Sequence, residues 1–147
     1  MSEIAPSFAT DLSHEHVSLL GQLGCLLASP EPGLSESAGR LVGRLTEMQA
    51  SLQRHFRFEE QGGYMSHILA DAPYLGRAAQ ELLAEHGRLS DCLDSLIAAV
   101  AGVQPESLVT HTVRDQVREW VLLVRGHEAR ENRLMQQACN QDIGTDD

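Results

Sequence analysis

Four histidines and two glutamates of this 147-residue chain occupy positions where the surrounding pattern calls for apolar side chains. They recur at the three- and four-residue spacing that places side chains on one face of an α-helix, among leucine, valine and alanine. The six residues are His16, His55, Glu59, His86, His127 and Glu131. A buried imidazole or carboxylate destabilises a core by several kcal/mol unless it is paired or binds a metal. The pattern therefore indicates one shared polar site inside a helical protein.

These six residues form two pairs and two single histidines. The pairs are His55-x-x-x-Glu59 and His127-x-x-x-Glu131, and the single histidines are His16 and His86. Residues four apart lie side by side on a helix, so both donors of a pair can reach one centre. Four imidazoles and two carboxylates suit two transition-metal ions, with two histidines terminal on each ion and Glu59 and Glu131 as bridges.

The mixed donor set favours iron or manganese over calcium, which prefers oxygen alone. Zinc is an alternative, but two carboxylate bridges with open positions favour a redox pair that can meet dioxygen. Ferritin-like proteins use Glu-x-x-His instead. One His-x-x-x-Glu pair is also the spacing of a surface ion pair on a helix. Two such pairs, each in line with the apolar face of its helix, argue against surface ion pairs. The main alternative is then a metal-free bundle with hydrogen-bonded histidines.

The two halves of the chain repeat one pattern. Leu12-x3-His16-x2-Leu19 returns as Leu82-x3-His86-x2-Leu89, and Met48-x3-Leu52-x2-His55-x3-Glu59 returns as Trp120-x3-Val124-x2-His127-x3-Glu131. A pseudo-two-fold arrangement of the halves would bring both donor sets to one level.

Proline and glycine clusters divide the chain into the four helices that must position these donors. We expect helices at about residues 11–29, 35–61, 73–102 and 105–140, with Pro73 and Pro105 near two of the starts. Runs with strand-like alternation are absent from the sequence and the connections are short. The sequence thus predicts an all-α, up-down-up-down four-helix bundle. Residues 1–140 would form one domain, and the polar residues 141–147 a flexible tail.

Charge and composition exclude several classes of partner. A formal charge of −10 argues against nucleic acid or an anionic membrane surface as the main partner. The first ten residues lack the basic flank of a secretory signal. The three cysteines, Cys25, Cys92 and Cys139, contain no CxxC pair and fit free thiols in a reducing cytoplasm. We expect Cys25 and Cys92 to be small core residues.

Residues near the predicted donors have simpler interpretations. His111 and Asp115 have ligand spacing but lie far along the helix from His127, so we expect a solvated pair. Glu60 would support the site from outside or face solvent, and Glu85 would face outward. Trp120, Met48 and Leu52 lie on the apolar helix faces and would be core residues that keep water from the site.

The order His16, His55-x-x-x-Glu59, His86, His127-x-x-x-Glu131 resembles the hemerythrin-like, or HHE cation-binding, domain over roughly residues 11–139. The resemblance implies a non-haem diiron centre in a four-helix bundle, with the four histidines as terminal ligands and Glu59 and Glu131 as bridges. Oxygen-carrying hemerythrins have a further histidine and an aspartate where this chain has Leu82 and Glu131. The resemblance therefore implies a more symmetric site with more open coordination.

Together these features predict a cytoplasmic diiron protein that binds metal and dioxygen or a related small molecule, in oxygen or iron binding or sensing. The sequence shows no clear general base beyond the metal ligands, which favours a binding protein over a substrate-specific enzyme. A sensing role would need a separate protein partner. One alternative is a diiron peroxidase, oxidase or nitric-oxide-scavenging enzyme. The other is a metal-free or zinc-stapled helical interaction module.

Overall fold

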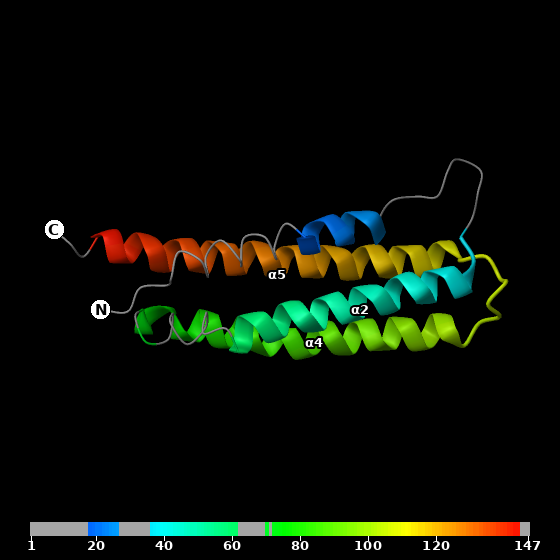
Figure 1. Cartoon of the computed structure of the whole chain (residues 1–147), viewed down its shortest axis with the longest axis horizontal. Helices are drawn as coiled ribbons and strands as arrows, with labels where there is room; N and C mark the ends of the chain where they lie inside the picture. The colour runs from blue at the N-terminus through cyan, green and yellow to red at the C-terminus, as the bar shows by residue number, and fades with distance from the viewer. Residues whose placement is uncertain (1–17, 27–35, 62–69, 71, 145–147) are drawn as a thin grey trace.

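The computed structural model describes residues 18–26, 36–61, 70 and 72–144. These residues are almost wholly helical, with an isolated bridge between Ser37 and Leu108 as their only strand-like pairing. Three long helices, α2 (Ala38–Gln61), α4 (Gly76–Ala101) and α5 (His111–Gly144), run along one axis, and the helical residues 18–26 lie against α5 (Figure 1). The chain reverses direction from each helix to the next, which confirms the up-down-up-down bundle.

The start of α2 is fixed by the loop between α4 and α5. The backbone N–H groups of Ala38 and Gly39 donate to the carbonyl oxygens of Ser107, at 2.7 Å, and Pro105, at 2.9 Å. The Ser37 hydroxyl accepts a further hydrogen bond from the Arg40 N–H. The first N–H groups of a helix lack partners within it, so these contacts satisfy the helix end and attach the loop to it.

This use of the loop explains why α5 begins later than predicted. The helix starts at His111, after Thr110, whose hydroxyl accepts a hydrogen bond from the Val113 N–H at 3.3 Å. Pro105 does not open it, because the residues around Pro105 are held in an irregular loop across the end of α2. α5 also continues to Gly144, beyond the predicted end. At Pro73 the prediction is confirmed: a short 3-10 turn, η1 (Pro73–Leu75), leads directly into α4.

Two apolar clusters fill the interior of the bundle. The larger one joins residues 18–26 to α2, α4 and α5 and includes Met48, Leu52 and Trp120, which are buried as expected. The smaller one contains Leu82 of α4 and Leu134 of α5. A layer of buried polar residues lies between the two clusters, and the bundle therefore surrounds that layer with apolar side chains above and below.

The prediction that Cys25 and Cys92 are core residues is wrong, since both are exposed free thiols. Cys92 precedes the fully buried Leu93, and a step of one residue turns a side chain about 100° around the helix, here out of the core. None of the helices in the described ranges is both long enough and apolar enough to cross a lipid bilayer.

Candidate metal centre

α2 brings the first pair of predicted donors into the polar layer. His55 is 1% exposed and Glu59 is fully buried, and the His55 Nε2 atom lies 2.6 Å from Glu59 Oε1. The pair occupies the last two turns of α2, on the same face as Leu52 and Leu45. The helical spacing thus carries the two donors inward together, as the sequence predicts.

α4 and α5 supply the donors on the opposite side. His127 and Glu131 of α5 are fully buried, with His127 Nε2 lying 2.5 Å from Glu131 Oε1. His86 of α4 is 4% exposed, and its Nε2 atom lies 3.1 Å from the same Glu131 oxygen. The Glu131 carboxylate therefore lies between imidazoles from two helices.

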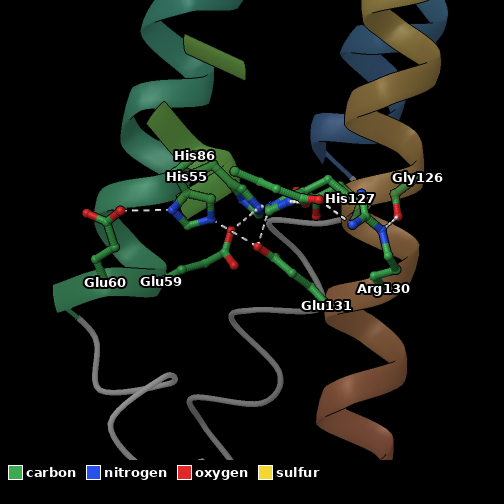
Figure 2. Close-up of polar contacts among 10 residues, drawn as sticks. His55, Glu59, Glu60, His86, Gly126, His127, Arg130 and Glu131 are labelled. Carbon is green, nitrogen blue, oxygen red and sulfur yellow. Dashed lines mark hydrogen bonds and ion pairs between the residues drawn. The ribbon is translucent and has the colours of Figure 1, made fainter. Parts of the chain in front are cut away.

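Five predicted donors point into one space between α2, α4 and α5 (Figure 2). The ligand atoms of these five residues and of Glu128 form two groups, each with all members within 4.8 Å of one another: His86, His127 and Glu131 in one, and His55, Glu59, Glu128 and Glu131 in the other. Glu131 belongs to both groups, which is the geometry a bridging ligand needs. The sixth predicted donor, His16, lies outside the described residues.

Sequence reasoning missed Glu128. This residue is 2% exposed, and its Oε1 atom lies 3.0 Å from the His55 Nε2 atom. The signal was present, because Glu128 follows Val121 and Val124 at helical spacing and precedes Glu131 by three residues. α5 buries a face wide enough to include both His127 and Glu128 at this level.

Two further carboxylates hold the histidines from outside. His86 Nδ1 donates a hydrogen bond to Glu60 at 2.8 Å, and His127 Nδ1 donates one to Glu85 at 2.7 Å. A carboxylate only accepts here, so each Nδ1 carries the hydrogen and a neutral ring keeps its lone pair on Nε2, the nitrogen facing Glu131. The expectation that Glu85 faces outward is wrong, because it also pairs with Arg130 and lies against His127.

Phe56 covers the side of the polar layer that faces the larger apolar cluster. Its ring stacks on the His86 imidazole, with the ring centroids 3.8 Å apart and the planes only 6° from parallel. The His127 ring meets Phe56 edge-on at 5.7 Å. This aromatic contact fixes the orientation of His86 and shields it from water.

The buried acidic and imidazole groups of the layer shift one another's pKa values. Burial raises the pKa of Glu59 well above its ordinary value, and the neighbouring Glu131 carboxyl raises it further. Burial acts in the same direction on Glu131, but the neighbouring Glu59 carboxyl and the two adjacent imidazoles outweigh it and lower the Glu131 pKa. Burial lowers the pKa of His55, yet contact with Glu128 and Glu59 raises it to about 10. Glu59 and His55 therefore retain their protons more strongly because carboxyl groups lie close to them.

The donor set fits a bound cation. His127 Nε2 and both Glu59 oxygens make no hydrogen bond among the described residues, although His127 Nε2 lies 2.5 Å from Glu131 Oε1 and Glu59 Oε1 lies 2.6 Å from His55 Nε2. These atoms lie close together without the geometry of a hydrogen bond. Buried polar atoms in this state cost stability, and a metal ion satisfies them together. His111 and Asp115, by contrast, are exposed on α5, as predicted.

Comparison with known families agrees with this geometry. The family model described as the hemerythrin HHE cation binding domain matches residues 7–139. The chain belongs to this family. A comparison with curated proteins and one with solved structures gave no match. Membership in the HHE family shows cation binding as the property of the domain, and the two buried donor groups lie within the matched residues.

Proposed function

We propose that this HHE domain holds a non-haem diiron centre and binds dioxygen or a related small molecule there. The observation that carries the proposal is the position of Glu131, whose carboxylate belongs to both donor groups. Two groups that share a carboxylate support two ions held close together. His55, Glu59, His86 and His127, with the predicted His16, would complete the ligand set.

The donor chemistry favours iron over its competitors. Calcium and magnesium prefer all-oxygen sites, whereas imidazole together with carboxylate suits iron, manganese and zinc. The absence of cysteine from both donor groups in the described part of the chain removes the ligand that most favours structural zinc. Manganese or zinc would occupy the same donors if supplied in excess.

When bound, a pair of ferrous ions supplies the electrons through which dioxygen is bound or reduced. The protein residues position and insulate that pair. Glu60 and Glu85 hold the Nε2 atoms of His86 and His127 toward the centre, and Phe56 covers the His86 ring. The apolar clusters on either side exclude bulk water, which slows uncontrolled oxidation.

We favour a binding or sensing role over substrate turnover. Within the described ranges, every candidate metal group belongs to this one layer, and all its carboxylates lie within reach of imidazoles. The exposed thiols of Cys25 and Cys92 form no disulfide, which supports the proposal of a reducing, cytoplasmic location.

The test is to load metal-free protein with ferrous iron without oxygen and then mix it with dioxygen in a stopped-flow spectrometer. We expect near-ultraviolet charge-transfer absorption and a spectral change that reverses when dioxygen is removed. Metal-free protein treated identically is the control. Repeated turnover of dioxygen, peroxide or nitric oxide would instead support a diiron enzyme, and absence of iron binding would support an interaction module.

A further inference from the structure

The two His-x-x-x-Glu pairs differ in the residue that directly follows the histidine. On α2 it is Phe56, and on α5 it is Glu128. Both side chains are buried, Phe56 at 5% exposure and Glu128 at 2%. The repeat in the sequence therefore places an aromatic ring on one side of the polar layer and an additional carboxylate on the other.

Glu128 reaches across the bundle to the donors of α2. Its Oε1 atom lies 3.0 Å from His55 Nε2, and its carboxylate belongs to the group that also contains Glu59 and Glu131. This group has one imidazole and three carboxylates among the described residues. The opposite group has two imidazoles, His86 and His127, and the shared Glu131.

We propose that Glu128 is a third carboxylate ligand and that it makes the two metal positions chemically unequal. The proposal rests on the proposed dinuclear centre and adds a division of labour within it. The position at His55 is oxygen-rich and selects a hard ion such as Mn²⁺ or Fe³⁺, and the position at His86 and His127 is nitrogen-rich and selects Zn²⁺ or Fe²⁺. Addition of the predicted His16 imidazole to the oxygen-rich position would leave its excess of carboxylates in place.

Charge supports the assignment. Glu59, Glu128 and Glu131 are each at most 2% exposed. Each of them lies within ion-pair distance of at least one buried imidazole of the layer. Three ionised carboxylates leave two divalent ions with one net positive charge instead of two. In a poorly solvated layer a smaller net charge is favourable, and it tolerates oxidation of one ion more readily.

The experiment uses two metals that report separately. One equivalent of Zn²⁺ is first added to metal-free protein, and its binding is measured by calorimetry. Mn²⁺ is then titrated in, and the signal of free Mn²⁺ is recorded by electron paramagnetic resonance. We expect wild-type protein to bind Mn²⁺ beside Zn²⁺. Glu128→Gln should weaken Mn²⁺ binding about 10-fold or more and leave the Zn²⁺ affinity within about twofold.

The matched control is Glu119→Gln, which removes the same charge from an exposed position of α5. It should bind both metals as the wild type does. Equal Mn²⁺ affinity in Glu128→Gln and wild-type protein would overturn the inference while leaving the dinuclear centre intact. Failure of the wild type to bind either metal would instead overturn the proposed function.

A variant-free measurement covers the case in which Glu128→Gln does not fold. Crystals of wild-type protein loaded with Zn²⁺ and Mn²⁺ are measured at the absorption edge of each metal. A manganese peak beside His55 and Glu128, with zinc beside His86 and His127, is the expected result. Manganese beside His86 and His127, or both metals mixed equally over both positions, would refute the assignment.

Discussion

The last turns of α2 and the middle of α5 carry the same donor pair but surround it differently. In α2 the sequence is His55-Phe56-Arg57-Phe58-Glu59-Glu60, and in α5 it is His127-Glu128-Ala129-Arg130-Glu131-Asn132. Each pair brings an imidazole and a carboxylate to the interior. Phe56 then stacks on an imidazole of α4, whereas Glu128 contacts an imidazole of α2. The repeat produces equal donors in unequal surroundings.

The meeting of the donors and the chemical character of their surroundings are therefore set by different residues. The four-residue separation determines which side chains meet, and this follows from helix geometry alone. The neighbour of each histidine determines how much charge and how much apolar surface the meeting place contains. Three predictions test these two effects and a fourth tests a surface ion pair of α4, beginning with the largest expected effect.

Glu131→Ala should impair metal binding more than Glu59→Ala, because Glu131 belongs to both donor groups and Glu59 to one. We expect Glu131→Ala to lose tight binding at both positions and Glu59→Ala to keep it at the position of His86 and His127. Calorimetric titration of each metal-free variant measures this. Equal losses in the two variants would contradict a bridging role for Glu131 that Glu59 does not share.

Phe56→Ala should destabilise the metal-free protein by about 3–5 kcal/mol, the usual range for a buried phenylalanine. Phe56→Leu retains most of the apolar volume and should lose mainly the ring contact with His86, about 1 kcal/mol. Urea denaturation followed by circular dichroism gives both values. If the leucine variant is as unstable as the alanine variant, the stacked ring matters more than its volume.

Glu85→Gln should weaken metal binding about 10- to 100-fold, since an outer carboxylate that orients a ligating histidine has an effect of that size. Glu60→Gln should have a smaller effect, because Glu60 is 47% exposed while Glu85 is 16% exposed and also paired with Arg130. Competition with a chelator of known affinity measures each value. A larger effect at Glu60 would contradict this ranking.

Arg77→Ala should change the free energy of unfolding by less than about 0.5 kcal/mol. The Arg77–Glu81 ion pair is 93% and 67% exposed, so water screens it. The same urea denaturation measures it and calibrates the method against an effect near zero. A loss above about 1 kcal/mol would show that surface charges of α4 contribute to the stability of the bundle, contrary to this expectation.

Much of the fold followed from periodicity and from breaker residues. The helix that Pro73 opens and the end of α2 at Gln61 lie where the sequence places them. The start of α5 could not be predicted, because the carbonyl groups of Pro105 and Ser107 are engaged by α2, a contact between segments far apart in sequence. Local signals carry no information about such a partner.

The grouping of the candidate residues was predictable, and the presence of Glu128 among them was missed. The described donors His55, Glu59, His86, His127 and Glu131 lie together as their spacing indicates. Glu128 was missed because a narrow seam through Val124 and His127 omits the neighbouring row that contains Val121. α5 buries both rows where it packs against α4 and residues 18–26, and the packed structure shows that width.

The most direct test of the dinuclear centre is elemental analysis of the wild-type protein as isolated, with Glu131→Ala purified in parallel. We predict about two iron ions per wild-type chain and a clear loss of iron in the variant. Wild-type protein that contains no stoichiometric metal, and takes up none when iron is supplied without oxygen, would contradict a dinuclear centre.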